Sequence, residues 1–216
     1  MKHALFAAIL FLTACTPMKS EIPQEAAPPP VVSVYASPTA EPWLEAVYAC
    51  AAEISVVIRL SVSQSAADIR LRLGEPPNLT TPAYQIGAED VLVVTHPQNP
   101  LADLTMEDVR RLFAEGGENV EVWVYASGGE VQELFEREVM HGTRIHALAR
   151  LALHPEQMLE SLERDSRAVG LLPRRWLRAP LREAFALRDV PVLAITPGEP
   201  QGAVKELIAC LQQRKE

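Results

Sequence analysis

The residues best placed to do chemistry are Ser127-Gly128-Gly129, which separate a strand pattern from a helix pattern. In 121–126 valine side chains alternate with aromatic ones, as in a half-buried strand, and the apolar residues that follow recur at helical spacing. The first N–H groups of a helix lack intrahelical partners and lie at the positive end of its dipole, and glycine lets a ligand approach the backbone. The junction is therefore suited to a small polar or anionic solute. Ser127 as an ordinary N-cap explains the same pattern.

Polar residues also precede another expected helix. Ser37 and Thr39 lie just before a helix that we expect from about Glu41, so they are helix caps by default and solute donors where a cleft exists. Arg72 is a candidate counter-ion for an anionic solute. Ser65, in the short connection before the strand that leads to Arg72, completes the set of candidate ligand residues.

Other chemistry is not indicated. Ser127 does not lie in a nucleophile elbow, because that motif needs glycine two residues earlier and Tyr125 is there. The histidines form no His-Glu-x-x-His motif, and the spacing of His141 and His146 turns them away from a shared helix face. We therefore expect a protein that is not an enzyme and that needs neither a metal nor a cofactor.

The N-terminus has the pattern of an exported, lipid-anchored protein. Lys2 is followed by an apolar run that is too short to span a bilayer, so residues 1–14 read as a signal peptide. The run ends in Leu-Thr-Ala-Cys15, which resembles the lipobox of bacterial lipoproteins, although a buried free thiol is an alternative for Cys15. Residues 15–30 are rich in proline and read as a tether. The expected location is the extracytoplasmic face of the cell membrane.

Charge and cysteine content narrow the class further. The formal net charge of −8 becomes −9 when Lys2 is removed with the signal peptide, so nucleic acid is not an expected partner. Cys50 and Cys210 are an even pair on apolar helical faces in an exported protein, which fits a disulfide between the first and last helices. Two buried thiols fit equally well, because the sequence does not show their geometry.

Apolar patterns alternate between strand and helix along the chain, which predicts an α/β fold with a parallel sheet. Thr105 and Asp108 form a capping box at the start of one helix. The expected strands are 31–36, 54–62, 67–71, 90–95, 121–126, 168–172 and 190–195. The expected helices start near 41, 105 and 130, near 145 (145–153), at 155 and at 201 (201–213).

Four segments then resemble, in order, the phosphate-binding-protein group of ABC-transporter solute-binding proteins. They are Asn99–Phe113 (NPLADLTMEDVRRLF), Val124–Phe135 (VYASGGEVQELF), Ala168–Pro173 (AVGLLP) and Val192–Pro197 (VLAITP). The resemblance implies a type 2 periplasmic-binding-protein-like fold, in which two α/β lobes bind a solute in a central cleft through helix N-termini. Mapped here, lobe 1 is 31–95 plus 186–216, lobe 2 is 96–185, and 90–95 and 190–195 are the hinge strands.

Departures from the family argue against phosphate itself. The family's Ser-Gly-Thr reads Ser127-Gly128-Gly129, and Glu130 places negative charge at the helix start, where an anion would enter. Only residues 63–66 separate the second and third strands, so a family helix is missing and the first lobe is trimmed. The resemblance implies capture of a small polar or anionic, oxyanion-like solute for an ABC importer permease by a monomer. The alternative is a lipoprotein with a degenerate cleft that acts as a sensor or protein-interaction module.

Overall fold

The computed structural model describes residues 27–214, so the predicted signal peptide, Cys15 and most of the tether lie outside the described residues. The strands are β1 Val31–Ala36, β2 Val57–Leu60, β3 Ile69–Leu73, β4 Ala83–Thr95, β5 Glu121–Tyr125, β6 Arg150–Ala152, β7 Ala168–Pro173 and β8 Arg182–Ile195. The α-helices are α1 Leu44–Glu53, α2 Met106–Glu115, α3 Glu130–Phe135, α4 Pro155–Arg164 and α5 Gly202–Gln213. Short helical turns are η1 Pro38–Trp43, η2 Gln64–Ala66, η3 Glu136–Met140 and η4 Arg174–Trp176.

The strands form one eight-stranded mixed sheet in the order β2-β1-β3-β8-β4-β7-β5-β6. The pairs toward both ends are parallel, but β8 runs antiparallel to β3 and β4, and β4 runs antiparallel to β7. The expectation of a parallel sheet is therefore wrong for the centre. The segment 145–153 also differs from expectation, because its central part is the edge strand β6 rather than a helix.

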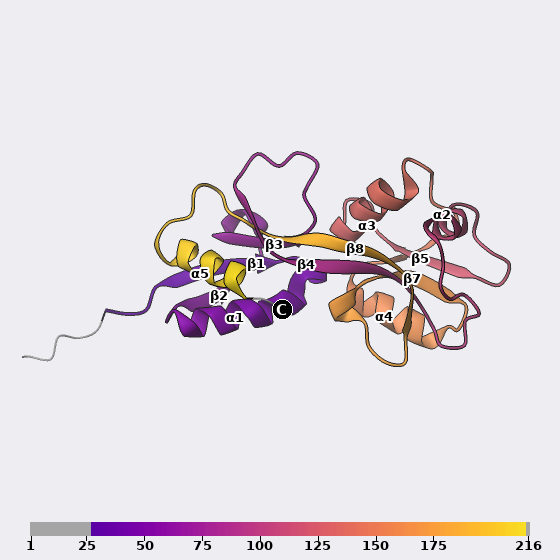
Figure 1. Ribbon diagram of the computed structural model, residues 1–216, viewed down its shortest axis with the longest axis horizontal. Helices are drawn as coiled ribbons and strands as arrows, with labels where there is room; N and C mark the ends of the chain where they lie inside the picture. Colours follow the sequence, from indigo (N-terminus) through magenta and orange to yellow (C-terminus); the bar gives the residue numbers. More distant parts are fainter. Residues whose placement is uncertain (1–26, 215–216) are drawn as a thin grey trace, which may run out of the picture.

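The long strands β4 and β8 join the two halves of the molecule (Figure 1). The C-terminal part of β8 pairs with β3, and the C-terminal part of β4 pairs with β7. Each strand starts several residues before the hinge segment expected from the sequence, and register shifts interrupt their pairing at three places along β4. We call lobe 1 the part built on β1–β3, α1 and α5, and lobe 2 the part built on β5–β7 and α2–α4.

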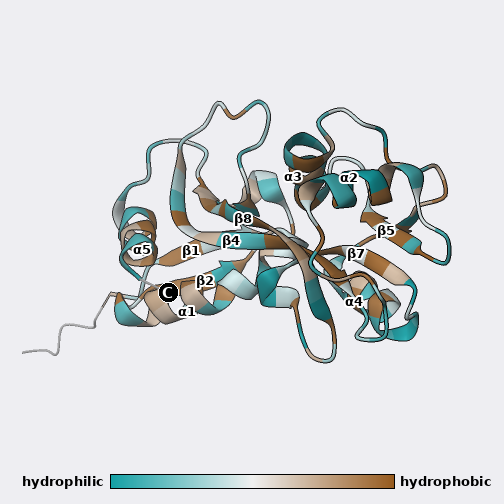
Figure 2. Cartoon of the chain, turned by 45° about the vertical axis from the view of Figure 1, so that its right-hand side comes forward, coloured by the Kyte–Doolittle hydropathy of each residue, from teal (hydrophilic) through white to brown (hydrophobic). Residues whose placement is uncertain are grey.

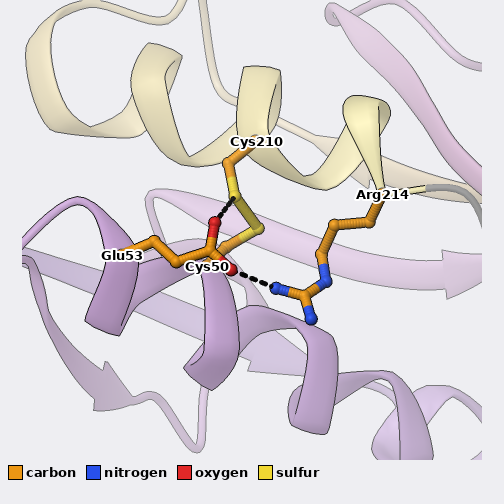
Figure 3. The surroundings of a disulfide bond; sticks show 4 residues. All are labelled: Cys50, Glu53, Cys210 and Arg214. Carbon is orange, nitrogen blue, oxygen red and sulfur yellow. Dashed lines mark hydrogen bonds and ion pairs between the residues drawn. A yellow bond between two sulfur atoms is a disulfide. The ribbon is translucent and has the colours of Figure 1, made fainter.

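In lobe 1 the helices cover one face of the sheet. The buried side chains Val34, Ile69 and Leu71 lie on this face, and α1 and α5 pack against it through apolar residues. A disulfide between Cys50 and Cys210 joins the two helices in front of the strands, with Arg214 paired to Glu53 beside it at 2.8 Å (Figure 3). Of the two alternatives that the sequence left open for these cysteines, the structure has the disulfide.

In lobe 2 helices cover both faces, with α2 and α3 on one side of the strands and α4 on the other (Figure 1). The capping box at the start of α2 is confirmed, since the Thr105 hydroxyl accepts from the Asp108 N–H and the Asp108 carboxylate accepts from the Thr105 N–H. Hydrophobic residues gather in the strands and on the strand-facing sides of the helices (Figure 2). Within residues 27–214, no helix is both long and apolar enough to span a bilayer.

Candidate functional site

The junction between β5 and α3 forms as the sequence predicts, but its cap differs. The helix starts at Glu130 with Gly129 as N-cap, and Ser127 is exposed, so the interpretation of Ser127 as the N-cap is wrong. Gly128 has φ 88°, a left-handed conformation that favours glycine, and a Cβ built there would meet no atom within 4 Å. The loop therefore borders open space rather than packed side chains.

The side chain of Glu130, at the start of α3 in lobe 2, extends to lobe 1 and lies between the start of α3 and the η1 turn. Its Oε2 accepts hydrogen bonds from the backbone N–H of Leu73 at 2.6 Å and from the hydroxyl of Thr39 at 3.0 Å. The hydroxyl of Ser37 lies 3.3 Å from that of Thr39 and is close enough to this carboxylate to favour its charged form. The donors that we expected to hold a solute in lobe 1 therefore hold a side chain of lobe 2.

Burial dominates the electrostatics of Glu130. Although the residue as a whole is only partly buried, its carboxylate is enclosed, and burial raises the pKa of Glu130 above its usual range. The hydrogen bonds from Leu73 and Thr39, the nearby hydroxyl of Ser37 and the charge of Arg72 act in the opposite direction on this pKa without cancelling the effect of burial. The bonds to Glu130 thus compensate only in part for taking an ionisable group out of water.

Further contacts join the lobes around this gap. On one side, Arg72 of β3 pairs with Glu133 of α3 at 3.3 Å. On the other, the indole N–H of Trp176 in η4 donates to the carbonyl of Thr39 at 3.2 Å. The Arg175 guanidinium lies 4.2 Å from the centre of the Trp43 ring, a cation–π distance. The lobes are thus held together by the protein's own side chains.

Two cavities lie on either side of Glu130, which lines both. The large cavity has a volume of about 380 Å³ and lies between the β3 end of lobe 1 and the α3 start of lobe 2. The small cavity, of about 120 Å³, lies between η1 and the starts of α3 and α4. Of the predicted ligand residues, the large cavity is lined by Arg72 and Gly128, and the small one by Ser37, Thr39 and Gly129.

Ser65 and Ser127 line neither of these two cavities, and both are exposed. The hydroxyl of Ser65 lies 3.0 Å from that of Ser63, the N-cap residue of the η2 turn. The sequence reasoning missed Arg70 and Glu130 as site residues. The signal for Arg70 was its place two residues before Arg72 on one strand, which puts both side chains on the same face.

Tyr125, which lines the small cavity, carries a buried hydroxyl group without a protein partner in the described part of the chain. The hydroxyl of Tyr125 is buried and makes no hydrogen bond within the described residues, and burial, with a smaller contribution from the charge of Glu156, raises its pKa. The N–H of Gln157 at the start of α4 is capped by the side chain of His154. Across residues 27–214, no cluster of three or more His, Cys, Asp or Glu side chains is arranged to hold a metal ion.

Solved structures share this architecture. A phosphate ABC transporter substrate-binding protein from Clostridium perfringens, described as putative and solved with bound phosphate, matches with a TM-score of 0.74 at 13% identity, covering 84% of this chain and 92% of that one. An ABC-type phosphate transport receptor from Vibrio cholerae matches at 0.60 and 14% identity, covering 84% and 93%. The regulatory domain of an OxyR2 variant from Vibrio vulnificus matches at 0.63 and 10% identity, covering 87% and 99%.

These matches confirm the expected fold, the type 2 periplasmic-binding-protein fold, which solute-binding proteins and LysR-type regulatory domains share. At such low identity the likeness describes the fold alone. No protein-family model matches the chain, and no curated protein matches its sequence.

Proposed function

We propose that this chain is a lipid-anchored extracytoplasmic solute-binding protein that captures a small polar or anionic solute and delivers it to the permease of an ABC importer. The observation that carries this proposal is the large cavity between the lobes. Its volume of about 380 Å³ falls in the range of roughly 300–1,000 Å³ that is usual for small-molecule sites. Polar and cationic side chains line it, so its ligand is a polar solute.

The same geometry argues against inorganic phosphate as the natural solute. The hydroxyl of Thr39 and the backbone N–H of Leu73 already donate to Glu130. An incoming oxyanion would have to displace this carboxylate and would meet its negative charge. The solute therefore binds beside Glu130 rather than in its place.

A second function is supported by the side-chain contacts that join the lobes. Glu130 occupies the donors of lobe 1 and Arg72 pairs with Glu133, so the protein's own side chains join the lobes. A lipoprotein in this state would act as a sensor or protein-interaction module with a degenerate cleft. This alternative requires that no small molecule stabilises the protein.

Thermal unfolding of the full chain in detergent, followed by tryptophan fluorescence, separates the two functions. The screen should contain sugars, sugar phosphates, organic acids, phosphonates, sulfate, molybdate and phosphate. A solute at a hundred times its dissociation constant stabilises the folded state by about 2.7 kcal/mol, which corresponds to a rise in Tm of roughly 5–10 °C. A rise with one chemical class supports solute capture, whereas an unchanged Tm throughout supports the second function.

The anchor and the importer need tests in cells. Metabolic labelling with a fatty acid should label the protein and fail to label the Cys15→Ser variant, which should leave the membrane fraction. A strain without the gene should take up the identified solute more slowly than a strain that carries it. Normal uptake in the deleted strain would contradict the role in import while leaving the binding result intact.

A further inference from the structure

The floor of the large cavity is the face of lobe 1 that no described helix of the lobe covers. Only η2 connects β2 to β3, where a longer connection would carry a helix over this face. Tyr35 of β1 pairs in register with Arg70 of β3, which pairs with Ile195 of β8. Directly paired residues point to the same face of a sheet, so these three side chains form one row across the floor.

The other walls come from a loop and from lobe 2. The loop between β3 and β4 rises above the sheet on the side of α3 (Figure 1) and contributes Pro76, Asn78, Leu79 and Thr80. Lobe 2 contributes Gly128 and Glu130, and η2 contributes Gln64. The cavity therefore combines apolar patches with amide and hydroxyl groups that converge from several elements.

Arg70 is the cation of this cavity that lacks a carboxylate. Its guanidinium donates to the hydroxyl of Thr81 at 3.3 Å, and within residues 27–214 no Asp or Glu pairs with it. Arg72, two residues along the same strand, is instead paired with Glu133 at 3.3 Å. A partly buried guanidinium gains most from a planar or tetrahedral oxyanion that accepts two parallel hydrogen bonds.

The local charge contrasts with that of the whole chain. The formal net charge of the protein is −8, yet the described charged side chains that line the cavity are Arg70, Arg72 and Glu130. Glu130 already accepts bonds from Leu73 and Thr39, so Arg70 is the cationic group that remains for a ligand. An anion that enters is drawn to Arg70 while the rest of the surface repels it.

We propose that the large cavity binds a small hydroxylated organic anion, whose carboxylate or phosphoryl group pairs with Arg70. This assignment rests on the proposed function and names its class of solute. The hydroxyl groups of the ligand exchange hydrogen bonds with Tyr35, Gln64, Asn78 and Thr80, which line the same cavity. A free inorganic oxyanion leaves most of these groups and most of the volume unused, so the organic part supplies much of the affinity.

Four probes test this with the full chain in detergent: glucose 6-phosphate, glucuronate, glucose and inorganic phosphate, each titrated by calorimetry. We expect at least one of the two organic anions to bind, and glucose and inorganic phosphate to bind at least tenfold more weakly. Arg70→Ala should weaken binding of the organic anion by about 10- to 100-fold, the range for a hydrogen bond to a charged group. Arg59→Ala, which removes an exposed arginine of β2 in the same lobe, should leave the affinity unchanged.

Arg70→Gln serves as a second variant in case Arg70→Ala fails to fold. It keeps hydrogen-bond donors at this position but removes the charge, so it should also weaken binding of the organic anion. Unchanged affinity in a folded Arg70 variant overturns the assignment. A neutral sugar that binds the protein and its Arg70 variants equally overturns the anion class but leaves solute capture standing. Inorganic phosphate that binds as tightly as glucose 6-phosphate also overturns it. Failure of all four probes overturns the assignment, and the broader screen then decides whether solute capture survives.

Discussion

Lobe 1 and lobe 2 build on the same sheet but cover it differently. Lobe 2 has α2 and α3 on one face and α4 on the other, whereas lobe 1 has α1 and α5 on one face and only the η2 turn and a loop over the other (Figure 1). Lobe 1 also contains the disulfide, which joins its two helices. A lobe with less helical cover buries less apolar surface, and a covalent link between its helices offsets part of that loss. The uncovered face is then free to carry the polar cavity.

The two lobes also differ in the charge they bring to the contacts around the start of α3. Lobe 1 contributes donors and cations, namely the hydroxyl of Thr39, the N–H of Leu73 and the guanidinium of Arg72. Lobe 2 contributes the carboxylates of Glu130 and Glu133. Lobe 1 is therefore the half that receives negative charge, whether from its neighbour or from a solute.

Loss of the disulfide should lower the stability of the protein more than any other change, and mainly in lobe 1. It closes a loop over a sequence separation of 160 residues, so replacing Cys50 and Cys210 together by serine should lower the free energy of unfolding by about 2–5 kcal/mol. Hydrogen exchange should increase more in α1 and α5 than in α2 and α4. Reduction of the unchanged protein should reproduce the effect and thereby separate the lost bond from the new serines. An equal increase in both lobes would contradict the comparison.

In Glu130→Ala, the lobe 1 donors that bind the Glu130 carboxylate should become available to a free anion. The N–H of Leu73 and the hydroxyl of Thr39 would lose their acceptor, which costs about 1–3 kcal/mol for buried groups. Millimolar phosphate or sulfate should restore much of this loss in chemical unfolding experiments and should bind by calorimetry. The exposed Glu118→Ala serves as the matched control and should show neither change. A variant that phosphate does not stabilise would show that these donors do not form an anion site.

Much of the fold could be predicted because its signals are local. Alternation and helical spacing found most strands and helices, and the capping residues Thr105 and Asp108 fixed the start of α2. The antiparallel centre could not be read in this way, because strand direction depends on pairing between segments far apart in sequence. The strand β6 was missed because three residues are too short a window for a periodic signal.

The candidate site was predicted less completely, for a different reason. The sequence indicated that Glu130 lies at a helix start and opposes an anion there, but not that its carboxylate reaches Leu73, 57 positions away. Arg70 looked like one of many arginines, and its lack of a carboxylate partner depends on which side chains the fold brings near it. Residue types and their spacing in the sequence therefore located the loops of the site. The position of the Glu130 side chain and the absence, within residues 27–214, of a carboxylate beside Arg70 required the tertiary structure.

The carboxyl group of Glu130 should also give the contact between the lobes a pH dependence. Burial raises its pKa above the value of 4.5 that an unfolded chain would show, so its contribution to stability is full below pH 4.5 and is lost as the pH rises through the folded-state pKa. Denaturant unfolding from pH 4 to pH 8 should show the wild type losing stability relative to Glu130→Gln over this window. The pKa of Glu89 is also raised, but Glu89 is present in both proteins, so its effect cancels in the difference. A difference with no slope, or with the opposite slope, would contradict the burial of this group.

The smallest effect should come from the ion pair between Arg72 and Glu133. Their side chains are 21% and 30% exposed, so water screens the pair in part, and Glu133→Gln should lower the free energy of unfolding by about 0.2–1 kcal/mol. Glu107→Gln breaks a pair with Arg110 that lies within lobe 2 and is more exposed, so it should cost less. A double-mutant cycle with Arg72→Gln isolates the coupling between the lobes from the separate cost of each change.

Because a solute that binds beside Arg72 would compete with Glu133 for its guanidinium, the solute should bind slightly more tightly to Glu133→Gln than to the wild type. Weaker binding would instead mean that Glu133 holds Arg72 in the position that the solute needs.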